Sequence, residues 1–149
     1  MGYTTTQSKT LLCAAHISCP VQVLVVDRQN GSAEILVDTV SRLIDSDISV
    51  TTFEDPADAM RHLEMKHFDV VIIGLDNNGA EPLSVMPYIR VQHPDLPVLA
   101  IGRRIRKSDL ACAEHFDVQD VFILPQRANK MKDLASYLSE KYFTQTVTV

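Results

Sequence analysis

The stretch FDVVIIGLDNNG, at residues 68–79, decides how this chain folds. Four consecutive apolar β-formers at 70–73 are closed by a cluster of Gly, Asp and Asn, a pattern that predicts a strand buried on both faces and followed by a loop. In open α/β sheets, ligands bind outside the carboxyl ends of the central strands. We therefore expect this loop to border a functional site, although Gly74 has no functional group and Asp76 lies two residues further out.

Length and composition favour one globular domain that needs no disulfide or structural metal ion for stability. The chain has 149 residues, of which 46% are hydrophobic, enough to build a core, and its formal charge of −5 argues against nucleic-acid binding by the domain as a whole. Cys13, Cys19 and Cys112 are odd in number and form no CxxC pair, which predicts reduced thiols in a cytoplasmic protein. No apolar run reaches the ~20 residues that span a bilayer.

The rest of the chain alternates strands with helices. Strands are predicted at 21–26, 48–53, 70–73, 96–101 and 118–124, and helices at 33–44, from Pro56, from Pro82, at 109–116 and at 128–142. This alternation predicts an α/β fold with a doubly wound, flavodoxin-like, five-stranded parallel sheet in the order 2-1-3-4-5. We expect an N-terminal extension at 1–20, one domain at 21–142, and a tail or the start of a linker at 143–149.

Several residues are expected to start or bend these helices. Ser32 and Ser108 are predicted to cap the first and fourth helices, and Asp55 before Pro56 is a strong start signal for the second. Pro87 is expected to lie inside the third helix and to bend it.

Five motifs in this order resemble the receiver domain of two-component response regulators. They are VLVVD at 23–27, FEDPADAM at 53–60, FDVVII at 68–73, HPDLPVLA at 93–100 and DVFILP at 120–125. The resemblance covers 21–142 and implies the CheY-like fold and a role in signalling.

The resemblance also implies a pocket of five chemical groups, and this sequence keeps one of them. The phosphoacceptor position is Gly74, the two acidic positions are Asp27 and Arg28, the hydroxyl position is Gly102, the lysine position is Leu124, and the switch aromatic is Val121. Glycine cannot act as a nucleophile, and a single carboxylate is a poor site for Mg²⁺. We therefore predict a degenerate pseudo-receiver with no catalytic residue, no metal and no cofactor.

Two features near the pocket leave alternatives open. Asp76 is interpreted as a turn residue, with use as a displaced phosphoacceptor as the alternative, and Asp27 is expected to pair with Arg28 or Arg103. The basic stretch Arg103, Arg104, Arg106 and Lys107 is either a solvated face or a site for an anion, a nucleotide or an acidic partner.

The function that these residues favour is protein–protein contact without phosphorylation. In receivers the usual contact face is built by the fourth helix, fifth strand and fifth helix, here 104–116, 118–123 and 128–142, with Arg104, Lys107, Tyr137 and Tyr142 as expected contact residues. The expected occupant of this face is a protein partner or a second copy of the chain. Degenerate receivers of this kind occur at the start of transcription regulators and ahead of the MinD-like ATPase of bacterial pilus-assembly and localisation proteins.

Overall fold

The computed structural model describes residues 20–43, 47–76 and 82–143. In these segments five parallel strands form one sheet in the order β2-β1-β3-β4-β5. The elements are β1 (Val21–Val26), α2 (Ser32–Leu43), β2 (Ile48–Phe53), α3 (Pro56–Met65), β3 (Val70–Gly74), the 3₁₀ helix η1 (Pro82–Val85), α4 (Met86–Gln92), β4 (Val98–Gly102), α5 (Lys107–His115), β5 (Asp120–Ile123) and α6 (Ala128–Lys141). The predicted strand order and doubly wound, CheY-like fold are confirmed.

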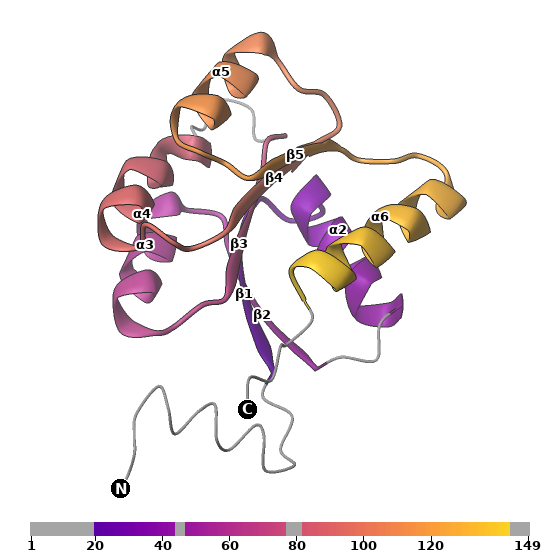
Figure 1. Ribbon diagram of the computed structural model, residues 1–149, viewed down its shortest axis with the longest axis horizontal. Coiled ribbons are helices and arrows are strands. Elements are labelled where there is room, and N and C mark those ends of the chain that lie inside the picture. The colour runs from indigo at the N-terminus through magenta and orange to yellow at the C-terminus, as the bar shows by residue number, and fades with distance from the viewer. Residues whose placement is uncertain (1–19, 44–46, 77–81, 144–149) are drawn as a thin grey trace, which may run out of the picture.

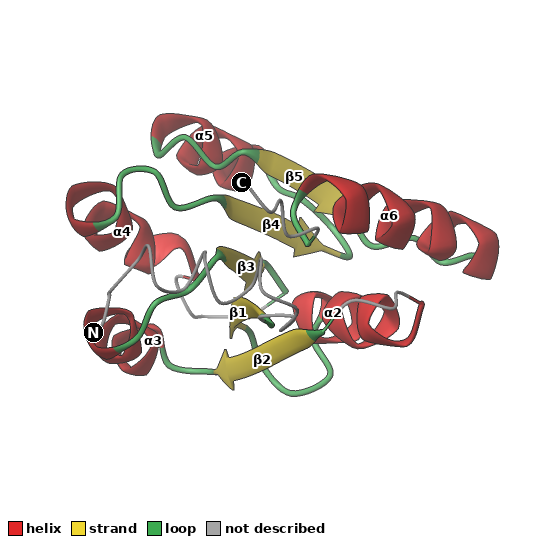
Figure 2. Ribbon diagram, turned by 60° about the horizontal axis from the view of Figure 1, so that its bottom comes forward, coloured by secondary structure: helices red, strands yellow, loops and turns green. Residues whose placement is uncertain are grey.

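Helices cover both faces of the sheet, as Figures 1 and 2 show: α2 and α6 lie on one side, and α3, α4 and α5 on the other. The alternation of side chains along each strand gives each layer its own core. On β1, for example, Val23 and Val25 belong to the α2/α6 layer, whereas Leu24 and Val26 belong to the α3/α4 layer. None of the helices in the described segments is long and apolar enough to cross a membrane.

The strand that the sequence predicted to be central, β3, lies in the middle of the sheet. All five residues of β3 are buried, and the strand pairs in parallel with β1 on one side and β4 on the other. Its last residue, Gly74, is paired with Ile101, so the loops after β1, β3 and β4 meet at the carboxyl edge of the sheet. This edge is the place where the sequence predicted a site.

Of the predicted helix caps, the one at Asp55 is confirmed. Asp55 is extended and its carboxylate accepts a hydrogen bond from the Ala57 amide at 2.9 Å, with Pro56 in the first turn of α3, as predicted. Both serine caps are wrong. Helix α2 is capped by the Asp27 carboxylate, and in α5 the Asp109 carboxylate accepts the amide of Arg106, the residue that precedes the helix.

The third helix also differs from the prediction. It begins as the 3₁₀ turn η1 and becomes α-helical only at Met86, so Pro87 lies in the first turn of α4 rather than in a helix interior. The first turn has no intrahelical partner for the amide that proline lacks, and the residue is therefore tolerated there without a bend.

Some predictions lie outside the described residues. These are the N-terminal extension at 1–19 with Cys13 and Cys19, the turn residues at 77–79, and the tail at 144–149. Phe143, just after α6, is fully buried in the α2/α6 layer.

Candidate functional site

Asp27 is the one acidic group of the receiver pattern that the sequence keeps, and it is buried as the cap of α2. Its side chain is 1% exposed. One carboxylate oxygen accepts the Arg28 amide at 2.9 Å, and the other accepts the amides of Ala33 and Glu34 at 2.9 and 3.2 Å. The carboxylate thus satisfies backbone donors of the first turn of α2 and lies against the positive end of that helix.

Two glycines make room for this carboxylate. A Cβ atom at Gly31 or at Gly74 would lie 2.2 Å from an Asp27 oxygen, closer than non-bonded atoms approach. The backbone of Gly74 is an ordinary strand conformation, so the requirement for glycine at this position is one of space. The phosphoacceptor position of the receiver pattern is therefore filled by the side chain of Asp27.

Asp76 joins the three loops at this edge. One of its oxygens accepts the Arg103 amide at 2.7 Å, and the other accepts the Arg103 guanidinium at 3.0 Å. The second oxygen also accepts the amide and the hydroxyl of Ser32. Arg103 in turn donates to the carbonyl of Asn30 at 3.3 Å. We call Asp76, Ser32 and Arg103 the loop clasp, because these residues come from the loop after β3, the start of α2 and the loop after β4.

The two carboxylates have opposite pKa shifts. Burial raises the pKa of Asp27 above its ordinary value of 3.8, against the effect of its backbone donors, and the neighbouring charge of Asp76 adds to the rise. Burial also acts to raise the pKa of Asp76, but the hydrogen bonds from Ser32 and Arg103 and the charge of Arg103 outweigh it, so this pKa lies below 3.8. The loops therefore stabilise the charged form of Asp76, and Arg103 balances that charge.

The expected ion pair of Asp27 with Arg28 or Arg103 is wrong. Arg28 contacts Asp27 through its backbone amide, and the guanidinium of Arg103 pairs with Asp76. The reason is geometric, because the amides at the start of α2 donate to Asp27, whereas Asp76 accepts the amide and the guanidinium of Arg103.

The residues present do not fit the Mg²⁺ ion that a receiver fold implies. Mg²⁺ needs several oxygen ligands in open positions, yet both oxygens of Asp27 accept backbone amides and Arg28 stands at the second acidic position. Both oxygens of Asp76 accept hydrogen bonds, and a guanidinium already provides the cation. Among the described residues, no three His, Cys, Asp or Glu side chains form a metal-binding group.

The remaining pocket positions are structural. A Cβ atom at Gly102 would lie 2.9 Å from the carbonyl oxygen of Arg104, so this glycine allows the loop after β4 to turn back closely. Leu124 donates its amide to the Gly102 carbonyl at 2.9 Å, and its side chain packs against the α2/α6 core. The half-buried Val121 packs on the opposite layer.

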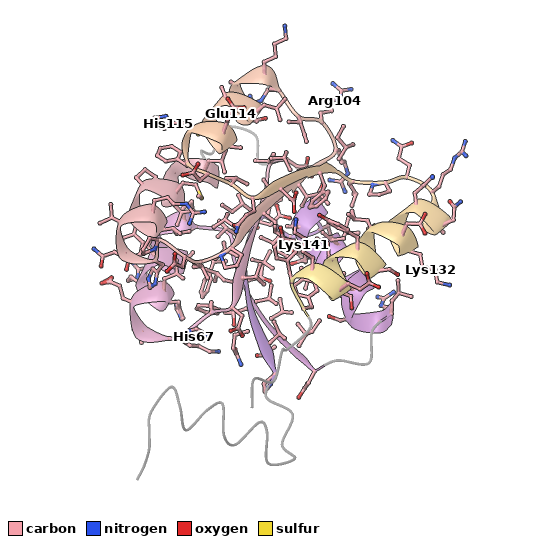
Figure 3. The ribbon with its side chains drawn as sticks, in the orientation of Figure 1. His67, Arg104, Glu114, His115, Lys132 and Lys141 are labelled. Carbon is pink, nitrogen blue, oxygen red and sulfur yellow. The ribbon has the colours of Figure 1, made fainter. Side chains whose placement is uncertain are left out.

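The basic stretch divides into two kinds of residue. Arg103 belongs to the loop clasp, and Arg106 pairs with Asp109 at 3.2 Å. The side chains of Arg104 and Lys107 are exposed and form no hydrogen bond or ion pair with another residue that the structure describes, and Figure 3 labels Arg104 at the rim of this edge. Of the four basic side chains in this stretch, Arg104 and Lys107 are therefore the two that are available to an external anion.

A second polar cluster lies where α6 meets β5. Lys141 donates to Asp120 at 3.0 Å and to the Tyr137 hydroxyl at 2.9 Å, and its ammonium group lies over the rings of Tyr137 and Tyr142. Tyr142 donates its hydroxyl to Asp120. The hydrogen bonds that Lys141 donates to Tyr137 and Asp120 raise the pKa of Lys141, and partial burial and Asp120 raise the pKa of Tyr142 to about 12.

This cluster places the two predicted contact tyrosines differently. Tyr137 is 43% exposed, whereas Tyr142 is half-buried and faces Asp120. The most exposed apolar residues of the α5, β5 and α6 elements are Leu110 and Ile123, at 49% and 62%. Sequence reasoning missed both, and it missed the roles of Ser32 and Lys141. The role of Lys141 had a signal in the sequence, because residues four apart on a helix, such as Tyr137 and Lys141, are neighbours.

No family model and no curated protein sequence matches this chain. Its structure is similar to solved response regulators. These include the phosphorylated cyanobacterial phytochrome response regulator RcpA (14% identity, 88% of this chain and 100% of that chain, TM-score 0.71) and a LuxR-family DNA-binding response regulator from Staphylococcus aureus (22%, 80% and 97%, TM-score 0.62). A third is the orphan response regulator HP1043 of H. pylori (17%, 82% and 96%, TM-score 0.60). At these identities the likeness establishes the receiver fold.

Proposed function

We propose that this chain is a phosphorylation-independent receiver-like domain that acts in signalling, regulation or localisation through protein contact, and that it is not an enzyme. The receiver fold supports a signalling role. The observation that carries the proposal is the side chain of Asp27, which occupies the space at Gly74 where a phosphoacceptor would stand.

The loop clasp supports the same proposal. Asp76, the alternative phosphoacceptor, is 8% exposed, and its two oxygens accept four hydrogen bonds from Ser32 and Arg103. An attacking oxygen needs an unoccupied lone pair directed at the phosphorus and a metal to neutralise the transferred group. In the clasp both oxygens of Asp76 already accept hydrogen bonds, and the Arg103 guanidinium is the cation beside them.

The partner surface in this proposal is the face of α5, β5 and α6. Leu110, Ile123 and Tyr137 expose apolar surface there, beside the exposed cations Arg104 and Lys107. Such a mixture of aromatic, aliphatic and basic groups suits a protein partner or a second copy of the chain in a cytoplasmic setting. The sheet also ends on this face, because β5 is an edge strand.

An NMR titration tests the central statement. Acetyl phosphate, or beryllofluoride with Mg²⁺, is added to ¹⁵N-labelled protein, and we expect no change in the amide signals of residues 74–76 and 102–107. Large shifts there would contradict the proposal, and their loss in Asp76→Asn would identify Asp76 as the phosphoacceptor.

A second candidate is a ligand-sensing module that binds a nucleotide or phosphate at residues 103–107. The exposed side chains of Arg104 and Lys107 at the start of α5 favour it. A nucleotide panel in a thermal-shift assay tests this function. A rise in melting temperature that is absent in Arg104→Gln/Lys107→Gln would support the sensor over the proposed interaction domain.

The contact face is tested by size-exclusion chromatography with light scattering. If the chain self-associates through this face, Ile123→Glu abolishes the association. Val50→Glu, on the opposite edge strand β2 and 40% exposed in the native chain, is the matched control and leaves it intact. Equal effects of the two variants would contradict the assignment of the face.

A further inference from the structure

The second strand, β2, forms an edge of the sheet on the opposite side from β5. In the order of the described strands it has one neighbour, β1, with which it is in continuous parallel register from Ile48 to Phe53. Figure 2 shows β2 along the border of the sheet, with α2 beside it. Neither the loop clasp nor the proposed contact face of α5, β5 and α6 uses this edge.

The hydrogen bonds to β1 identify which backbone groups of β2 are unpaired. The carbonyl of Phe53 accepts the amide of Asp27 at 2.9 Å, so the backbone of Phe53 faces β1. Backbone groups alternate in direction along a strand, and the other odd-numbered residues of β2 therefore also face β1. Ile48, Val50 and Thr52 direct their N–H and C=O groups outward instead. These groups have no hydrogen bond with another residue that the structure describes.

This edge lacks the features that usually prevent a strand from pairing with another chain. Natural edge strands are protected by charged side chains, by proline or by a β-bulge. The sequence of β2, ISVTTF, has no charged residue and no proline, and its register with β1 is unbroken. Most of its residues are β-branched, a composition that favours pairing with an extended segment. Val50, in the middle of the strand, is 40% exposed.

A groove of about 180 Å³ lies beside this edge, between β2 and α2. Its lining residues have two acidic side chains and no basic one; they are Glu34, Val37, Asp38, Ser41, Val50 and Thr52. The side chain of Asp38 is 58% exposed and pairs with Arg42 one turn further along α2. Asp47 and Glu54, directly before and after β2, add two exposed carboxylates. The edge is therefore acidic as well as unpaired.

These features define the chemistry of a matching partner. An extended segment that adds to β2 as a further strand satisfies the outward backbone groups, and every second side chain of the segment then lies over the groove. Val37 and Val50 suit a β-branched side chain there, and the carboxylates of Glu34 and Asp38 suit lysine or arginine. A second copy of the same edge is a poor match, because it would bring carboxylates against carboxylates.

We propose that β2 binds an extended, basic segment of a partner protein by strand addition, with alternate side chains of that segment in the groove beside α2. The site gives the domain a second interaction surface, at the opposite edge of the sheet from the α5, β5 and α6 face. The two surfaces share no residue, and strand addition at β2 does not depend on the phosphoacceptor position.

Hydrogen exchange followed by NMR tests the backbone part of the proposal. The probe is a synthetic peptide of alternating lysine and valine residues. The amides of Ser49 and Thr51 face β1, so we expect them to exchange slowly with and without peptide. The outward amides of Ile48, Val50 and Thr52 should exchange quickly in the free protein, and saturating peptide should slow them by about tenfold or more.

Three results of this experiment would overturn the proposal. The first is a failure of the peptide to bind, and the second is slowing that does not alternate along β2. The third is slow exchange of the outward amides before peptide is added, because another segment of the chain or a second copy would then already cover the edge. Spectra at two protein concentrations distinguish these two occupants.

Variants and a fluorescence anisotropy assay with labelled peptide test the two kinds of contact separately. Val50→Pro removes an outward N–H group and spares the bonds to β1, so we expect the affinity to fall by about tenfold or more. Asp38→Lys replaces an attraction by a repulsion and should lower the affinity by about three- to tenfold. The matched control is Glu114→Lys, an equal change of charge at an exposed position of α5 that Figure 3 labels, and it leaves the affinity unchanged.

Control peptides keep the proposal falsifiable if Val50→Pro fails to fold, which circular dichroism would reveal. A peptide with N-methyl groups along its backbone lacks the donors for strand addition, and a peptide of glutamate and valine has the wrong charge. We expect both to bind at least about tenfold more weakly than the lysine and valine peptide. Equal binding of either control peptide, or equal effects of Asp38→Lys and Glu114→Lys, would overturn the proposal.

Discussion

Replacement of Gly74 by alanine tests whether the side chain of Asp27 occupies the space that a side chain at residue 74 would need. The added Cβ would lie 2.2 Å from Asp27 Oδ1 and 2.3 Å from its Cγ, and both residues are buried. The carboxylate must then move, and it cannot move without weakening its hydrogen bonds to the amides at the start of α2. The variant therefore combines overpacking with loss of a helix cap.

The magnitude follows from these two parts. Overpacking of a tight core costs about 1–3 kcal/mol, and loss of a capping carboxylate costs about 0.5–2 kcal/mol. Alanine in place of a strand glycine returns about 0.5–1 kcal/mol through lower chain entropy. We therefore expect Gly74→Ala to lower the free energy of unfolding by about 1–4 kcal/mol.

A double-mutant cycle with Asp27→Ala isolates the contact. Once the carboxylate is removed, the space beside residue 74 is empty, and Gly74→Ala should be neutral or stabilising by about 0.5–1 kcal/mol. Urea unfolding followed by far-ultraviolet circular dichroism measures all four proteins. The reasoning is refuted if Gly74→Ala costs the same with and without Asp27, or if Gly74→Asp is stable and accepts a phosphoryl group from acetyl phosphate.

Three further predictions concern single side chains. Asp76 has a lowered pKa, so its contribution to stability is present above 3.8 and is lost as pH falls through the folded-state pKa; the stability advantage of wild type over Asp76→Asn should therefore shrink in acid urea titrations. Tyr142 has a pKa raised from 10.0 to about 12, so wild type should lose stability as pH rises through this window. Tyr142→Phe should lack that part of the loss in melts near pH 11, and an identical decline in both proteins would count against the contact with Asp120. Asp55→Ala should lower the free energy of unfolding by about 1 kcal/mol, measured in urea, because it removes the cap of α3.

The elements that the sequence predicted best are those whose signal is periodic. The bounds of β1 and β2 agree to the residue, and the buried run at 70–73 correctly identified the central strand. Side-chain periodicity depends on which face is buried, and it can be seen in a short window of sequence. The start of α3 was also predictable, because Asp55 and Pro56 form a complete local signal.

The site was less predictable because its contacts join distant parts of the chain. Ser32 looks like a cap when only its neighbours are considered, but the helix amides are taken by Asp27, and its hydroxyl donates to Asp76, forty-four residues away. The partner of Arg103 is likewise twenty-seven residues distant. Which carboxylate an arginine meets depends on the directions of side chains at a sheet edge, and composition or spacing does not contain that information.

One arrangement of side chains explains the residues that stand at the receiver-pattern positions. Once Asp27 turns to cap α2, Gly31 and Gly74 must both lack a Cβ, and Asp76 becomes the anion that receives Ser32 and Arg103. A phosphoryl group or a metal ion would have to displace a helix cap and a guanidinium at the same time. The loops after β1, β3 and β4 are thus held together by the protein's own side chains. Variants of the loop clasp should therefore alter the stability of the domain before they alter the partner contacts proposed for the α5, β5 and α6 face.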